Sequence, residues 1–450
     1  MARTLTSPGR IFLGLGVALA GLFLSLAWSG ARIGATGHLM RLGAAAGVYG
    51  IALLLLARGR HPGTPILLVC LGLALAARAP LVVKPAGRQD DTHRYLWDAR
   101  LQRAGLNPYL VRPDDPSVAW LHTTATRSMN NQDVPSPYPP GAQYFFRFVT
   151  AISESAVAIK AALVVAECVT VLALWWWLRV REFDPAWTLA YAWHPVVILE
   201  TAGGGHLDAL GVMFLVVAAA TLSRGWRLAA ALAMAASVSI KLLPVVLAPL
   251  IIRRVRPWQA ALGGLCLAAA YVPFMDGWRI PVGSLGAVVD RFRFNQLGFD
   301  LIMPVVGAHP AAAVALAAGL ALSWLLSREP AGRRTGGSTV PDVVGSGPSP
   351  AAWAWPMAAS LLLAPMIYPW YLIWLVPFAV TLATVPLLVW SLAVLLVYRV
   401  WAIAAAGGPW EVPPSLLAWE YGLVLAAGVV VVLIGRRAAA RRRTTAACPD

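Results

Sequence analysis

The chain has 450 residues, of which 59% are hydrophobic and 12% charged, and its formal net charge is +16. Soluble domains carry about 25% charged residues, so this composition excludes an ordinary soluble protein and indicates a polytopic membrane protein. The basic balance does not indicate a nucleic-acid partner, because the arginines stand in short clusters beside apolar runs. That arrangement is typical of the cytoplasmic ends of membrane spans.

Apolar runs long enough to cross a bilayer as helices begin near the N-terminus. The first three cover residues 11–28, 42–57 and 64–83. Placing the arginine clusters inside puts the N-terminus in the cytoplasm and a first outer loop, 84–155, outside. A fourth span then ends at Arg179 and Arg181.

The middle of the chain predicts a broken helix. Two shorter spans near 187–201 and 206–222 precede the apolar run from Leu228 to Ile252. As one helix, that run would place the arginine cluster after it outside, so we expect a break near Lys241 and Pro244. Broken membrane helices usually line a cavity, which makes Lys241 a candidate site residue.

The remaining chain continues the same pattern. A span near 258–275 leads to a second outer loop, 277–308, and a span near 309–326 leads to a flexible cytoplasmic loop, 327–351. Four further runs precede a basic cytoplasmic tail, 436–450, and lie near residues 352–367, 371–384, 386–404 and 418–435. We therefore predict an all-α bundle of about 12–14 spans, forming one transmembrane domain over residues 1–435 with interfacial helices in the first outer loop.

Most of the ionisable chemistry lies in the stretch DDTHRYLWDARLQRAGLNPY, residues 90–109. On a helix, Asp91, Tyr95 and Asp98 share one face, and a helix lying in the interface would rest Leu96 and Leu101 in lipid. An alternative is a solvated amphipathic helix whose first aspartate is only an N-cap.

These residues resemble a family. The D-x-H-x-Y pattern of Asp91, His93 and Tyr95, continued by Asn107 and Tyr109, is similar to the first outer loop of GT-C class glycosyltransferases. The resemblance is closest to bacterial polyprenyl-phosphate-mannose-dependent mannosyltransferases. It extends to four later stretches, SPYPPGAQYFF (136–146), HPVVILETAGGGHLDALG (194–211), SIKLLPVVLAPL (239–250) and YPWYLIWLVP (368–377).

The resemblance implies that an aspartate of the first outer loop is the catalytic base. The motif places this role on Asp91, with the adjacent Asp90 as its rival and His93 as a further catalytic candidate. A carboxylate suits the role, because it takes the proton of a sugar hydroxyl as that hydroxyl attacks the anomeric carbon. Attack opposite the lipid phosphate inverts that centre without a covalent intermediate.

The leaving phosphate needs donors at the membrane boundary. Lys241 is the first choice, followed by Arg100, Arg291 and Arg293. The alternatives are a lysine that snorkels to the interface and outer-loop arginines that bind lipid headgroups.

The segment GGGHLD supplies a second constellation, because its glycines permit a sharp turn. His206 and Asp208 would face the outer cavity, and Glu200 precedes them in apolar surroundings; an alternative is a packed His206 hydrogen-bonded to Asp208. No ligand spacing specifies a metal site among the candidate ligands Asp90, Asp91, His93, His206 and Asp208. We expect no metal and no other cofactor.

Aromatic residues complete the predicted substrate site. Prolines around Tyr138 indicate a rigid wall for a sugar or polyprenyl chain, and Tyr368 and Trp370 are interface anchors that the family resemblance makes lipid-carrier contacts. Tyr95, Asn107 and Tyr109 belong to the same predicted substrate-binding set.

We therefore predict an inverting hexosyltransferase at the outer face of the cytoplasmic membrane. Its partners would be the bilayer, a polyprenyl-phosphate-linked sugar donor, most simply mannose, and a lipid-linked glycan acceptor. Two other classes remain: a transporter or flippase of a lipid-linked sugar, and a non-catalytic scaffold of envelope assembly.

Overall fold

The computed structural model describes residues 7–85, 91–328 and 347–446, with side chains described to residue 438. Within these residues the chain forms helices and no strand. The prediction of an all-α polytopic bundle is therefore confirmed. Asp90 lies outside the described residues, as does most of the predicted cytoplasmic loop 327–351.

Seven helical segments of the described chain are long and apolar enough to cross a bilayer. They are α1 (Ser7–Trp28), α2 (Thr36–Ala57), α3 (Thr64–Val83), α6 (Ala156–Val180), α15 (Ala308–Ser327), the run Leu382–Ala405, and α19 (Pro414–Ala446). The run Leu382–Ala405 consists of η9 (Leu382–Thr384), α17 (Val385–Ala393), η10 (Val394–Tyr398) and α18 (Arg399–Ala405).

Shorter helices fill the space between the long ones. The α-helices are α4 (Asp91–Arg103), α5 (Pro140–Ile152), α7 (Leu189–Ala192), α8 (Pro195–Ile198), α9 (Asp208–Ser223), α10 (Arg227–Ile240), α11 (Ala248–Ile252), α12 (Pro257–Tyr271), α13 (Leu285–Arg291), α14 (Leu297–Val306) and α16 (Pro350–Leu362). The 3-10 helices are η1 (Pro116–Leu121), η2 (Thr126–Ser128), η3 (Pro185–Thr188), η5 (Leu243–Leu247), η6 (Val272–Phe274), η7 (Pro369–Trp374) and η8 (Val376–Phe378), and η4 (Leu199–Gly203) is a π-helix.

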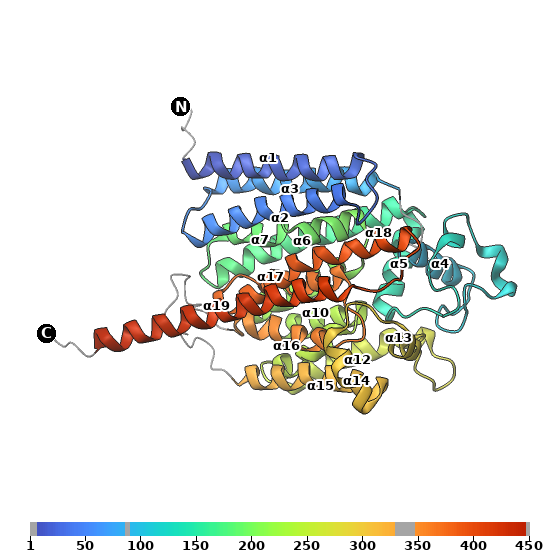
Figure 1. The fold of residues 1–450 in the computed structure, drawn as a ribbon. Helices are drawn as coiled ribbons and strands as arrows, with labels where there is room; N and C mark the ends of the chain where they lie inside the picture. Colours follow the sequence, from blue (N-terminus) through green and yellow to red (C-terminus); the bar gives the residue numbers. More distant parts are fainter. Residues whose placement is uncertain (1–6, 86–90, 329–346, 447–450) are drawn as a thin grey trace.

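The long helices lie side by side, so the molecule has two ends (Figure 1). The described chain starts and finishes at one end, where α1 begins and α19 projects away from the bundle. At the opposite end, α4, α5 and α13 cluster with the loops of the first and second outer segments. The polar, aromatic-rich stretch 90–109, most of which forms α4, therefore lies at the same end as residues 277–308.

A buried ion pair joins two of the spanning helices. Arg78 of α3 and Glu167 of α6 lie 2.7 Å apart and are 3% and 2% exposed. Arg78 also donates to the carbonyl oxygens of Ala74 and Ala192. The guanidinium is thus satisfied inside the bundle. Removing one partner of such a buried ion pair lowers the free energy of unfolding by about 3–5 kcal/mol.

Helix α4 differs from the prediction. Leu96 and Leu101, expected in lipid, are 6% and 0% exposed. The expectation is wrong because the chain after α4 folds back over it: the ring of Trp97 stacks on that of His122 at 4.1 Å, and Leu101 packs among Val118, Leu121 and Met129. The helix is thus held by protein on several sides rather than floating in the interface.

Asp98, on the predicted face of Asp91, is part of this packing. Its carboxylate is fully buried and pairs with Arg94 at 3.0 Å, and it accepts hydrogen bonds from Ser136 and Gln143. These contacts tie α4 to Ser136, in the segment before α5, and to Gln143 of α5.

The predicted helix break at Lys241 is confirmed. Helix α10 ends at Ile240, and Lys241 has extended backbone angles of φ −153° and ψ 144°. Pro244 then lies in the first turn of η5. The break places the Lys241 side chain beside α9 instead of along the axis of α10.

Candidate active site

Asp91 is the first residue of α4 and lies at the centre of a polar cluster. Its Oδ2 is 3.5 Å from His206 Nδ1 and accepts from the Tyr138 hydroxyl at 3.5 Å. Its Oδ1 accepts from Asn130 Nδ2 at 3.3 Å. The side chain is 22% exposed, so it is surrounded by donors and still open on one side, as a base that must reach a substrate has to be.

The turn between η4 and α9 brings a second carboxylate to the same histidine. His206 Nε2 lies 3.0 Å from Glu200 Oε2, so the imidazole stands between two acids. The turn is possible because Gly205 has a φ of +66°, a conformation that residues with a Cβ rarely adopt.

The charges of this turn shift the pKa of both groups, which lie outside the seven candidate spans of the described chain. Burial lowers the pKa of His206, but its contacts with Asp91 and Glu200 outweigh burial and raise it to about 10. Burial raises the pKa of Asp91, but His206, Asn130 and Lys241 lower it to below its ordinary value. At neutral pH the cluster therefore holds an ionised Asp91 beside an imidazolium.

Lys241 supplies the second cation. Its Nζ donates to both carboxylate oxygens of Asp208, at 2.7 and 2.9 Å, and lies 3.9 Å from the ring centroid of Tyr371. Asp208 also accepts from Trp374 Nε1 at 2.6 Å. Asp208 is 2% exposed and Lys241 24% exposed, so the ammonium is anchored from the protein side and reaches open space.

The alternative of a packed His206 hydrogen-bonded to Asp208 is wrong. The two residues are separated only by Leu207, but His206 pairs with Glu200 and Asp91, whereas Asp208 pairs with Lys241. The start of α9 separates them, and each acquires partners from elsewhere in the chain.

A stack of aromatic rings forms one wall of the cluster. The ring of His206 lies on that of Trp370 with centroids 3.7 Å apart and an interplanar angle of 9°. Trp370 stacks on Tyr368 at 4.5 Å, and Tyr368 stacks on Phe294 at 4.4 Å. The stretch 368–377 therefore contributes the stacked rings of Tyr368 and Trp370, which fix the plane of the His206 ring.

The other predicted aromatic and amide residues support the opposite wall. Tyr95 stacks on Phe146 at 4.4 Å and its hydroxyl accepts from the Leu207 amide at 3.4 Å. The Tyr109 hydroxyl donates to the Tyr138 carbonyl at 2.7 Å, and Asn107 donates to the Phe274 carbonyl at 2.7 Å. These contacts hold Tyr138 where its own hydroxyl meets Asp91.

The predicted arginines and His93 bind elsewhere among the described residues. Arg100 pairs with Glu154, Arg291 with Asp133 at 2.7 Å, and Arg293 donates to backbone carbonyls and rests 4.8 Å from the Phe299 ring centroid. His93 Nδ1 contacts Ser128 Oγ at 3.1 Å. The described contacts of the three arginines are therefore made away from Asp91 and Lys241.

The sequence analysis assigned no role to Trp374, Tyr371 or Asn130. Their contacts with Asp208, Lys241 and Asp91 are made across long sequence separations. A pattern within one stretch does not encode such contacts. The available signal was the spacing of Tyr371 and Trp374, which are three residues apart and share one face of a helical turn.

Two other features of the structure bear on ligands. No group of three or more His, Cys, Asp or Glu side chains in the described residues has the geometry of a metal site; metal independence stays a prediction.

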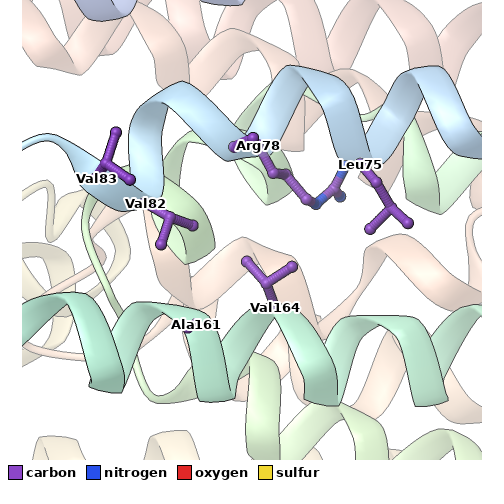
Figure 2. A pocket seen from close by; sticks show the side chains of 7 residues that line it. Leu75, Arg78, Val82, Val83, Ala161 and Val164 are labelled. Carbon is purple, nitrogen blue, oxygen red and sulfur yellow. The ribbon is translucent and has the colours of Figure 1, made fainter. Parts of the chain in front are cut away.

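A hollow of about 330 Å³ opens between α3 and α6 (Figure 2), lined by Leu75, Arg78, Ala79, Val82, Val83, Ala161 and Val164. Because Arg78 is neutralised by Glu167, this hollow offers apolar contacts and no group for sugar chemistry.

The sequence is similar to known proteins. A family model described as Alpha-(1->6)-mannopyranosyltransferase, N-terminal domain, matches residues 9–256, which include Asp91, Glu200, His206 and Lys241. Alpha-(1->6)-mannopyranosyltransferase A of Mycobacterium tuberculosis is 23% identical over 356 residues, covering 68% of this chain. The chain spans 63% of the length of that curated relative. No solved structure matches this chain.

Proposed function

The chain belongs to the alpha-(1->6)-mannopyranosyltransferase family, and on this premise we propose that it transfers mannose from a polyprenyl-phosphate carrier to a lipid-linked glycan. The observation that carries the proposal is the joint placement of an ionised carboxylate, Asp91, and an anchored ammonium, Lys241. One turn joins the two groups, because His206 contacts Asp91 and Asp208, two residues later, pairs with Lys241.

Asp91 would act as the base. As the acceptor hydroxyl attacks the anomeric carbon, its proton passes to Asp91 and the bond between that carbon and the phosphate oxygen breaks. The phosphate leaves with the electron pair, and the anomeric centre inverts. The depressed pKa of Asp91 keeps the base ionised at neutral pH, and the Asn130 and Tyr138 donors hold its orientation.

Lys241 would stabilise the leaving phosphate. Asp208 and Trp374 fix one side of this arrangement, which leaves the ammonium preorganised for a negative charge that grows as the bond breaks. The ammonium rests against the Tyr371 ring and is 24% exposed, so a phosphate can reach it from the open side.

The stacked rings of Trp370 and Tyr368 suit contacts with the sugar or with the first units of the carrier chain. The active end is the one opposite the described termini (Figure 1). We assign it to the outer face of the cytoplasmic membrane, because the arginines that directly follow α2 and α6, Arg58 and Arg181, lie at the other end.

Reconstituted protein tests the donor and the class together. We expect transfer of radiolabelled mannose from a synthetic polyprenyl-phosphate mannose to a glycolipid extract, and no transfer from a nucleotide-linked mannose. Movement of the intact lipid-linked sugar across sealed vesicles without transfer would replace the enzyme by the flippase. Transfer from the nucleotide sugar alone would contradict the carrier.

A further inference from the structure

Arg78 and Arg181 are buried to the same extent, each being 3% exposed, but they differ in their surroundings. Arg78 pairs with Glu167 and donates to two carbonyl oxygens. Within the described part of the chain, the Nε and Nη1 atoms of Arg181 have no hydrogen-bond acceptor. A buried cation without an acceptor is costly, so an anion at this position would stabilise the folded protein.

We propose that Arg181 binds a phosphate group at the end of the bundle opposite the Asp91 cluster. The phosphate belongs to the headgroup of an anionic lipid or is a free phosphate ion. Arg181 directly follows α6, which runs from the Asp91 cluster to the end where α1 begins (Figure 1). The inference therefore concerns a second site and does not depend on the proposed sugar transfer.

Three segments meet around the Arg181 side chain. One turn earlier on α6, Trp177 Nε1 donates at 3.0 Å to the Oγ of Ser223, the last residue of α9. The chain at Gly347 lies against both helix ends, since a Cβ built on Gly347 would be 2.9 Å from Arg181 Nη1 and 2.8 Å from Ser223 Oγ. The guanidinium is thus enclosed by the ends of α6 and α9 and by the segment that leads into α16.

The N-terminus of α16 is a second positive feature at this place. Gly347, which lies close to Arg181 Nη1, stands three residues before Pro350, the first residue of the 13-residue α16. The amide end of a helix carries a partial positive charge and favours phosphate. An anion beside Gly347 is therefore attracted both by the guanidinium and by this helix end.

Arg181 keeps its charge although it is buried. Burial lowers its pKa, to about 10, which is still well above neutral pH, so the side chain remains a guanidinium. The nearest acids along the chain are Glu182, which is exposed, and Asp184, which contacts His61. Neither forms an ion pair with Arg181, so the charge is left for a ligand.

A phosphate suits this position by geometry and by charge. A guanidinium offers several N–H donors in one plane, which match phosphate oxygens. Arg179 on the last turn of α6 and Arg224 directly after α9 are exposed and add positive potential at the same helix ends. Basic pockets between the ends of membrane helices bind lipid headgroups, so the lipid and the free ion are tested separately.

The test measures the Tm of the delipidated wild type in a neutral detergent, with dioctanoyl phosphatidylglycerol or inorganic phosphate added. We expect Tm to rise by about 2–4 °C near saturation, because a ligand that binds only the folded state stabilises it. A rise with the lipid alone identifies a headgroup site, and a rise with inorganic phosphate as well identifies a site for the free ion. No rise with either probe overturns the proposal.

Two matched variants assign the effect to the buried side chain. Arg181→Met removes the cation and keeps the apolar stem, and Arg179→Met is the control, because Arg179 is exposed near the same helix end. We expect Arg181→Met to lose the rise in Tm and Arg179→Met to keep it. A rise that Arg181→Met retains, or that both variants lose equally, overturns the proposal.

The variant without added probe tests whether Arg181 is unpaired. Arg181→Met should then melt no lower than the wild type, since a buried unpaired charge has been removed. A lower Tm means that the guanidinium already has a partner within the protein, and overturns the proposal. If Arg181→Met gives no folded protein, Arg181→Lys decides. Lysine keeps the charge without the planar donors, so the apparent Kd of the stabilising probe should rise by about tenfold, and an unchanged Kd overturns the proposal.

Discussion

Replacing Lys241 by Met removes the cation and keeps the apolar stem. Asp208 is then a 2%-exposed carboxylate that keeps the Trp374 donor but loses two charged hydrogen bonds. Breaking a buried pair by removing one partner costs about 3–5 kcal/mol. Since Lys241 is 24% exposed and water reaches the site, we expect a loss of unfolding free energy of about 3 kcal/mol, the lower end of that range.

The double variant Lys241→Met with Asp208→Asn separates stability from function. No charge is left unpaired and Trp374 still has an amide oxygen to donate to, so the stability loss should shrink to about 1 kcal/mol. Transfer should stay low in both variants, by about 100- to 1,000-fold in kcat/KM, because the leaving phosphate has lost its cation.

The assays are denaturant unfolding in detergent micelles and transfer from polyprenyl-phosphate mannose. Recovered stability with unrecovered transfer supports the phosphate role. If either variant keeps kcat/KM within threefold of the wild type, Lys241 serves only to pair Asp208, and the reasoning is refuted.

Three further predictions concern single positions. Because the pKa of Asp91 lies below its ordinary value, the base stays ionised as pH falls to about 4, so kcat of the folded protein should hold to that pH; an acid limb near pH 6 would contradict this. Leu101→Ala should lower the free energy of unfolding by about 2–5 kcal/mol, since the side chain is fully buried. A change under about 0.5 kcal/mol would instead indicate that Leu101 faces lipid. Trp370→Ala should lower kcat and move its alkaline limb, because the ring that orients His206 is gone, whereas Trp370→Phe should recover most of kcat; equal defects in both would assign Trp370 to binding alone.

Local pattern was enough to predict the spans and the reactive stretch. The apolar runs end where arginine clusters begin, so α1, α2 and α3 follow from hydropathy and charge. The break at Lys241 followed from charge parity, and the glycines before His206 indicated a turn. Each of these features is decided by neighbours in sequence.

Contacts between distant segments were not available from the same patterns. Leu96 and Leu101 were predicted to face lipid. The segment around His122 and Met129 that covers α4 has no hydrophobic periodicity from which its packing could be predicted. The pairing of His206 with Glu200 instead of Asp208 depends on the π-helix and on the open space at Gly204. Both are properties of the folded backbone, which residue identity alone does not determine.

The central claim is that the Asp91 carboxylate takes the proton of the acceptor. Asp91→Asn keeps the shape and removes the base, and Asp115→Asn is a matched control, because Asp115 is an outer-segment aspartate that only caps η1. With both proteins folded and at equal amounts, the account predicts that transfer from polyprenyl-phosphate mannose falls at least about 100-fold in Asp91→Asn and is unchanged in Asp115→Asn. Transfer by Asp91→Asn at the wild-type rate would contradict it.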